Sequence, residues 1–136
     1  MKELNRAEIC SLLKRAETIA VVGISGTAGK TSRIIADYLL ENNYRVVGVN
    51  PAAPSIPGIP VYKSLTDIPF KIDIVNVFRR SEDIPQLIPD ILQINPECLW
   101  LQLGISNSAA VESAFEQGIS IVQDKCIYVL HQDCKA

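Results

Sequence analysis

Short runs of apolar residues alternate along the chain with longer stretches in which apolar positions recur at the spacing of an α-helix. The apolar runs are rich in Val and Ile, and several are apolar at consecutive positions, which is typical of parallel strands covered by helices on both faces. These runs predict strands at residues 18–24, 44–50, 72–78, 98–104 and 119–124.

The segments around these strands have helical patterns. Helices are expected at residues 4–16, 31–42, 81–94 and 107–117. A short helix that frays is expected after Asp124, and Thr31 or Ser32 is expected to cap the helix at 31–42. Pro89 predicts a kink or a break in the helix at 81–94. The proline-rich segment 50–69 is expected to wrap an edge of the sheet, with residues 60–62 as a short extra strand.

The repeated order of strand, helix and strand predicts the fold class. We expect an α/β protein, with a three-layer, doubly wound, Rossmann-like sheet of about five parallel strands and helices on both faces. Residues 1–136 are expected to form a single domain. Ligands of such sheets bind beyond the carboxyl ends of the strands. The segments expected to carry a site are therefore 23–31, 50–53, 78–81, 102–107 and 124–126.

Composition narrows the classes of ligand. Apolar residues make up 48% of the chain and aromatic residues only 6%, so the core is expected to be aliphatic. The formal net charge of -2 provides no basic field for a nucleic acid, and no apolar run approaches the length of a membrane span. We expect a soluble, cytoplasmic protein that binds neither nucleic acid nor membrane and recognises any anion through a local site. The pattern does not fix a protein partner or an oligomeric state.

The cysteines and the single histidine do not suggest a metal centre. The four cysteines have no C-x-x-C spacing, so we expect no zinc site and, in a reducing compartment, four free thiols. His131 lies close to the C-terminus and is interpreted as an exposed residue of the tail. No nucleophile elbow or paired-carboxylate motif is present, and no catalytic residue is assigned.

The loop after the first predicted strand, "VVGISGTAGKT" (21–31), has features of two nucleotide-binding motifs. Its Gly29-Lys30-Thr31 matches the end of a P-loop, but five residues separate Gly23 from Gly29 where that motif has four. Counted from Gly23, the loop instead fits the dinucleotide fingerprint, with Ser25 in place of the second glycine and Ala28 in the third position. Such a loop holds phosphates at the N-terminus of a helix.

The end of the second predicted strand bears on which nucleotide is held. NAD-binding proteins have an acidic residue here for the ribose, and NADP-binding proteins have an arginine nearby, whereas this chain has Asn50 and Pro51. The nearest basic pair is Arg79-Arg80, after the third strand. An oxidoreductase that binds NAD(P) therefore stays open as an alternative but is disfavoured, and a P-loop kinase is the third choice.

Taken together, the motifs resemble those of a known family. The segments "VVGIS", "VNP", "VFRRSE", "WLQLGI" and "QDKC" follow one another in an order similar to that of the stand-alone CoA-binding domain family. These are small proteins similar to the N-terminal domain of the succinyl-CoA synthetase α subunit. The resemblance extends from about residue 18 to 130. It implies a Rossmann-like domain that holds coenzyme A, or an acyl-CoA, across the carboxyl ends of its strands.

The resemblance also implies roles for individual residues. Those expected to meet phosphates are Gly23, Ser25, Gly26, Thr27, Lys30 and Ser32. Those expected around the nucleotide are Asn50, Pro51, Phe78, Arg79 and Arg80, and those expected beside the pantetheine arm are Gln102 and Gly104. The chain departs from the family in having "GTAGK" where a proline-rich turn is common. It also has Ala52-Ala53 where synthetase subunits have a lysine.

The expected function is that of a CoA-binding module that is non-catalytic or whose catalytic role is not defined. Cys126, just past the last strand, is the one candidate for a reactive group. If the thiol of CoA reached this residue, a mixed disulfide would form under oxidation.

Overall fold

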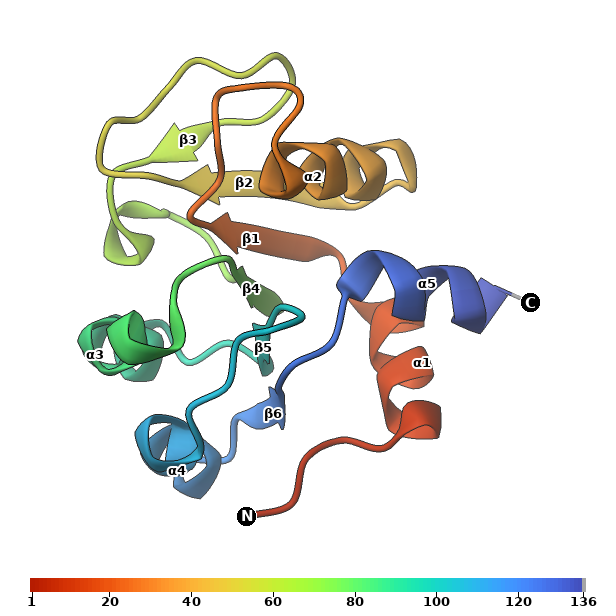
Figure 1. The fold of residues 1–136 in the computed structure, drawn as a ribbon, viewed down its shortest axis with the longest axis vertical. Helices are drawn as coiled ribbons and strands as arrows, with labels where there is room; N and C mark the ends of the chain where they lie inside the picture. The colour runs from red at the N-terminus through yellow and green to blue at the C-terminus, as the bar shows by residue number, and fades with distance from the viewer. Residues whose placement is uncertain (136) are drawn as a thin grey trace.

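The computed structural model describes residues 1–135, which form a six-stranded parallel sheet with helices on both faces (Figure 1). The strand order is β3-β2-β1-β4-β5-β6, which is the Rossmann order, and it confirms the predicted doubly wound sheet. The strands are β1 (Thr18–Val22), β2 (Arg45–Val49), β3 (Val61–Tyr62), β4 (Ile74–Val77), β5 (Cys98–Leu101) and β6 (Ser120–Val122).

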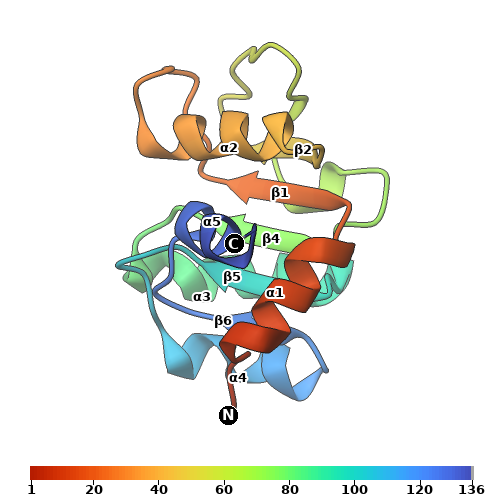
Figure 2. The same ribbon diagram turned by 90° about the vertical axis from the view of Figure 1, so that its right-hand side faces the viewer.

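Five α-helices cover the sheet. They are α1 (Arg6–Arg15), α2 (Thr31–Glu41), α3 (Ile84–Ile94), α4 (Ser108–Glu116) and α5 (Ile127–Lys135). Figures 1 and 2 show α1, α2 and α5 on one face and α3 and α4 on the other. Because side chains alternate along a strand, Ile19 and Val21 pack under the first group, whereas Ala20 and Val22 pack under the second.

The proline-rich segment behaves as predicted at the sheet edge. Its residues Val61 and Tyr62 form β3, which pairs in parallel with Gly48 and Val49 of β2. This strand is the sixth, beyond the five main strands predicted from the apolar runs.

Pro89 does not break α3, so of the kink and the break predicted from the sequence, the break is wrong. The helix runs from Ile84 to Ile94 with Pro89 inside it. Its apolar face, which includes Ile88 and Ile91, is buried, whereas Pro89 lies on the exposed side. The carbonyl that loses its amide partner is that of Pro85, in the exposed first turn, where water can solvate it.

The expectation of four free thiols is wrong. Cys10 of α1 and Cys134 of α5 form a disulfide, and their Cα atoms lie 5.3 Å apart. The two cysteines are 124 positions apart in sequence, and they meet because α1 and α5 pack side by side on one face of the sheet. Cys98 is buried in β5 and Cys126 is half-buried, and both are free thiols. Within residues 1–135, no helix combines the length and the apolar character needed to cross a membrane.

Candidate functional site

The loop that follows β1 turns sharply at Gly23, which has a φ of +84°. A Cβ at this position would lie 2.5 Å from the carbonyl oxygen of Phe78, so only glycine fits. The Gly23 amide donates to the carbonyl of Val49, and the Phe78 amide donates to that of Val22. Gly23 therefore lets the ends of β1, β2 and β4 approach one another closely.

Two serines hold the rest of this loop against α2. The Ser25 amide donates to Oγ of Ser32 at 3.0 Å, and Ser25 Oγ accepts from the Thr27 amide at 3.0 Å. Because Ser25 Oγ acts here as an acceptor, its own hydroxyl hydrogen can still be donated to a ligand. Ser32 is buried within the first turn of α2, so its contribution is to position the loop.

The N-terminus of α2 has no side-chain cap. Lys30 is the N-cap residue and makes no capping hydrogen bond, so the expectation that Thr31 or Ser32 caps this helix is wrong. Ser32 has its hydroxyl committed to the Ser25 amide instead. The free amide groups of a first helical turn, together with the helix dipole, favour a bound anion. The exposed lysine at the cap adds a positive charge at the same end.

Arg33 supports the loop, although the sequence patterns did not indicate it. Its Nη1 donates to the carbonyl of Gly26 at 2.9 Å, and its Nε lies 3.3 Å from Oδ1 of Asp37. The Arg33 side chain is only 13% exposed, so this arginine fixes the loop from beneath. The sequence feature that could have indicated this role is the position of the arginine, in the first turn of the helix that follows a glycine-rich loop.

Asn50 joins the loops that follow β1 and β2. Its Nδ2 donates to the carbonyl of Ile24 at 2.8 Å, and its Oδ1 accepts from the Ala52 amide at 2.8 Å. Pro51 is exposed beside it. The amide of Asn50 thus organises the backbone at the sheet's carboxyl edge.

A cleft of about 700 Å³ opens between the ends of β4 and β5 and the start of α5. It brings together five of the predicted site residues, the candidate reactive residue Cys126, and neighbours in or next to the same strand-end segments. The lining residues are Thr31, Phe78, Arg79, Arg80, Ser81, Glu82, Gln102, Leu103, Gly104, Ile105 and Cys126. Thr31, the first residue of α2, connects this cleft with the loop at 23–30, which carries all of the predicted phosphate-binding residues except Ser32.

The two arginines of the cleft differ in their surroundings. Arg80 is 74% exposed, and its Nε lies 3.1 Å from Asp83 Oδ2 and 3.9 Å from Glu82 Oε1. The hydrogen bond and charge of Asp83, with the charge of Glu82, raise the pKa of Arg80. Arg79 is half-buried, and within residues 1–135 its side chain has no hydrogen bond or ion pair. Arg79 is thus the guanidinium with donors available to a ligand.

Hydrogen bonds fix the backbone on the other side of the cleft. Oε1 of the buried Gln102 accepts from Asn76 Nδ2 at 3.2 Å and from the Ile127 amide at 3.3 Å. Gly104, with a φ of +84°, donates its amide to Oδ1 of Asp124 at 2.6 Å. Asp124 and Gln102 therefore act as hydrogen-bonding residues just past the ends of β6 and β5.

The chemical groups of the cleft suit the binding of an anionic ligand with an apolar portion. Leu103 is 65% exposed at the cleft, and the Cys126 thiol also lines it. Burial raises the pKa of Cys98, which is enclosed in β5 away from the cleft. His131 lies elsewhere, in a cavity near the amino ends of β1 and β2. Within residues 1–135, no cluster of three or more potential metal ligands occurs.

These features define a Rossmann-like domain with a glycine-rich loop after β1 and a cleft at the carboxyl edge of its sheet. The family model described as "CoA binding domain" matches residues 17–132, so the chain belongs to this CoA-binding domain family. The family predicted from the sequence motifs is confirmed.

The relatives include small single-domain proteins and parts of larger enzymes. The uncharacterized protein YneT of Bacillus subtilis is 36% identical over 131 residues, covering 96% of this chain and 97% of its own length. The acetate–CoA ligase (ADP-forming) II of Archaeoglobus fulgidus is 29% identical over 103 residues, which cover 74% of this chain and 14% of the ligase. A hypothetical protein from Pyrococcus horikoshii has the same fold, with a TM-score of 0.92 at 29% identity, covering 100% of this chain and 98% of that one.

Proposed function

We propose that this protein binds coenzyme A or an acyl-CoA at the carboxyl edge of its sheet and acts as a binding module. Membership of the CoA-binding domain family supports the ligand class. The single observation that supports the position is the continuity, through Thr31, between the uncapped N-terminus of α2 and the cleft lined by Arg79. No catalytic residue is assigned.

The loop after β1 is the proposed site of the diphosphate. The amides at the start of α2 point toward the carboxyl edge of the sheet, and the Ser25 hydroxyl is still able to donate. Gly26, Thr27 and Lys30 complete the expected set on this loop, and Thr27 and Lys30 are exposed. Gly23 and Ser32 act on the loop backbone, because one permits its turn and the other accepts from the Ser25 amide.

The nucleotide and the pantetheine arm are proposed to lie on either side of this loop. Arg79 provides a free guanidinium for the ribose phosphate, while Phe78 and Arg80 flank it. Asn50 and Pro51 shape the neighbouring edge. The pantetheine arm follows the backbone from Gln102 to Gly104 toward Cys126, where Leu103 and Ile105 provide apolar contacts.

NAD(P) is the competing ligand. A dinucleotide pyrophosphate needs bare backbone at the second position of the fingerprint, where this chain has Ser25 with its hydroxyl folded onto the loop. Asn50 stands where an NAD-binding protein has the acidic residue that holds the ribose, and both ends of its side-chain amide already bond to the backbone. Both observations favour CoA over NAD(P).

A panel of ligands tests the proposal. Thermal unfolding is measured with CoA, acetyl-CoA, NAD, NADP and ATP, and the dissociation constants are then determined by calorimetry. A ligand that binds only the folded state raises the melting temperature, so CoA and acetyl-CoA are expected to raise it while the other three do not. Stabilisation by NAD or NADP alone would assign the protein to the competing class.

A site variant separates specific from adventitious binding. Thr27→Glu places a carboxylate on the exposed part of the loop, where it would repel a diphosphate. Ser113→Glu, on the exposed surface of α4, is the matched control, because it adds the same charge outside the proposed site. CoA binding is expected to be lost in the first variant and kept in the second. Equal affinity in both would show that the diphosphate lies elsewhere.

A further inference from the structure

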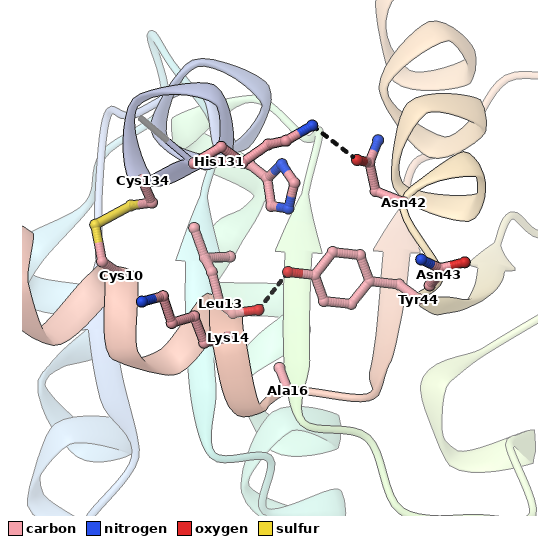
Figure 3. Close-up of a pocket in the computed structure, with 10 residues that line it drawn as sticks. Cys10, Leu13, Lys14, Ala16, Asn42, Asn43, Tyr44, His131 and Cys134 are labelled. Atoms are coloured by element: carbon pink, nitrogen blue, oxygen red, sulfur yellow. Dashed lines mark hydrogen bonds between the residues drawn. A yellow bond between two sulfur atoms is a disulfide. The ribbon is translucent and has the colours of Figure 1, made fainter.

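A second cavity, of about 560 Å³, lies at the amino ends of β1 and β2, beneath α1 and α5 (Figure 3). The Cys10–Cys134 disulfide forms one side of it, and the ring of Tyr44 forms another. His131 projects between them, with its ring centroid 5.7 Å from that of Tyr44. This cavity plays no part in the proposed CoA site.

The cavity is separate from the CoA cleft. Cys126 lines the cleft just before α5 begins, and Cys134 lines the second cavity at the other end of the same helix. At a rise of about 1.5 Å per residue, the eight positions between these two cysteines place them roughly 12 Å apart along the helix. One ligand cannot use the disulfide and the Cys126 thiol as parts of a single small site.

The disulfide can be reached from solvent. Cys10 and Cys134 are both half-buried, and both line the cavity. Thiol–disulfide exchange requires that a thiolate approach one sulfur of the bond, and accessible disulfides are the ones that exchange. A disulfide in the wall of a cavity that can hold a small molecule meets this requirement.

The cavity has a basic lining. Lys14 and Lys135 line it, and within residues 1–135 no acidic side chain does. Lys135 Nζ lies 3.4 Å from Asn42 Oδ1, which holds the ammonium group across the opening between α5 and α2. The acidic residues that adjoin lining residues in sequence are Glu17, Glu41 and Asp133, and all three are exposed. This lining favours a ligand with negative charge.

The remaining lining accommodates a short aliphatic chain. Leu13, Ala16 and the Tyr44 ring provide apolar surface, and the Tyr44 hydroxyl donates to the carbonyl of Leu13, which fixes the ring. The His131 ring is fixed by a hydrogen bond of 2.6 Å between its Nδ1 and the Tyr38 hydroxyl. The shape and charge therefore fit a small molecule with an apolar stem and an anionic group.

We propose that this cavity is a thiol–disulfide exchange site, in which small anionic thiols reduce the Cys10–Cys134 disulfide and the corresponding small disulfides reoxidise it. The thiolate of the small molecule attacks Sγ of Cys134, the bond between the two protein sulfurs breaks, and Cys10 leaves as a thiolate. Lys14, one helical turn after Cys10 on α1, stabilises that thiolate.

A second small thiolate completes the reaction. It attacks the sulfur of the small molecule in the mixed disulfide, and Cys134 leaves as a thiolate. Both protein thiolates take up protons from water. Two small thiols are thus oxidised to one small disulfide while the protein disulfide is reduced to two thiols. The reverse sequence uses a small disulfide as the oxidant.

The charge of the thiol provides the test. The oxidised protein is incubated with mercaptopropionate, mercaptoethanol or cysteamine at equal thiolate concentrations, quenched with acid and alkylated, and the Cys10 and Cys134 peptides are quantified by mass spectrometry. The rate is expected to be first order in thiol and on the order of tenfold higher for mercaptopropionate than for cysteamine. Equal rates for all three thiols would overturn the proposal without any variant.

Lysine variants test the origin of the preference. Lys14→Gln combined with Lys135→Gln is expected to abolish the preference for mercaptopropionate. Lys71→Gln is the matched control, because Lys71 is an exposed lysine whose neighbour Ile72 packs on the opposite face of the sheet. A preference that survives in the double variant would show that the two lysines do not cause it. A reduction rate independent of thiol concentration would mean that the disulfide reacts only by unfolding, and either outcome would contradict the proposal.

Discussion

The side-chain amide of Asn76 donates a hydrogen bond of 3.2 Å to Oε1 of Gln102, which ties the buried centre of β4 to the residue that follows β5. The same oxygen accepts from the Ile127 amide at the start of α5. Oδ1 of Asn76 has no hydrogen-bond partner within residues 1–135. One glutamine therefore satisfies two buried donors beside the cleft at the carboxyl edge, while one buried acceptor stays unpaired.

Because of this arrangement, substitutions of Gln102 and of Asn76 are expected to change the stability of the fold by different amounts. Gln102→Leu leaves two buried donors unpaired and is expected to lower the free energy of unfolding by about 2–4 kcal/mol. Asn76→Val removes the unpaired oxygen together with the donor, so its effect is expected to stay within about 1 kcal/mol. Urea denaturation measures both. In the double variant the loss should be smaller than in Gln102→Leu alone, and simple additivity would contradict the shared role of Gln102.

Gly23 should not tolerate a side chain. Gly23→Ala combines a positive φ with a Cβ that would lie 2.5 Å from the Phe78 carbonyl oxygen, so a loss of roughly 2–4 kcal/mol in unfolding free energy is expected. Gly29→Ala is the control in the same loop, because no atom lies within 4 Å of its added Cβ. Chemical denaturation should show little change for Gly29→Ala. A similar loss in both would show that the close approach at Phe78 is not the cause.

Arg79 is expected to recognise the ribose phosphate of CoA. Arg79→Ala should weaken CoA binding by about 10- to 100-fold, the range of a charge-assisted hydrogen bond, and should scarcely change the binding of dephospho-CoA. Arg80→Ala should have a smaller effect because Arg80 is already paired with Asp83. Calorimetry with both ligands makes the comparison. Equal losses for CoA and dephospho-CoA would mean that Arg79 does not contact this phosphate.

Cys126 is expected to form a mixed disulfide with CoA. CoA disulfide added to the folded protein would exchange with the Cys126 thiol, releasing one CoA thiol for each adduct formed. Mass spectrometry should locate the adduct on Cys126, and Cys126→Ser should abolish it. Cys98 should not react, because its thiol is buried and burial raises its pKa. If peptide mapping found no adduct on Cys126, the pantetheine arm would have to end elsewhere.

His131 predicts a dependence of stability on pH. Burial, and then the charge of Lys135, lower its pKa in the folded protein, and Tyr38 and Tyr44 pack against its ring. The unfolded chain therefore takes up a proton first as the pH falls below the ordinary histidine range near 6.5. The associated stability is present above that pH and is lost as the pH falls through the folded pKa. Denaturation curves at pH 7 and pH 5 should show that the free energy of unfolding falls less between these pH values in His131→Gln than in the unchanged protein.

The sequence predicted the elements well because they depend on local patterns. The alternation of β-branched runs and helical stretches placed every main strand and helix to within a few residues. The N-terminal cap of α2 was harder to predict, because Ser32 looks like a cap in sequence but its hydroxyl bonds to the Ser25 amide across the loop. Propensity cannot show which of two partners a hydroxyl takes.

The site was predictable in its location and less so in its contacts. Topology alone brings the strand ends together, so Phe78, Arg79 and Gln102 meet in one cleft as the fold implies. The free state of Arg79 and the paired state of Arg80 depend on side-chain directions in one short turn. The disulfide depends on the packing of α1 against α5, two helices from opposite ends of the chain, and sequence spacing carries no sign of that contact.

The Cys10–Cys134 disulfide makes the covalent structure a ring that takes in nearly the whole chain. A single cut in an exposed loop, such as residues 51–55 between β2 and β3, would open the ring without releasing a fragment. Each strand of the sheet would stay covalently connected to every other strand.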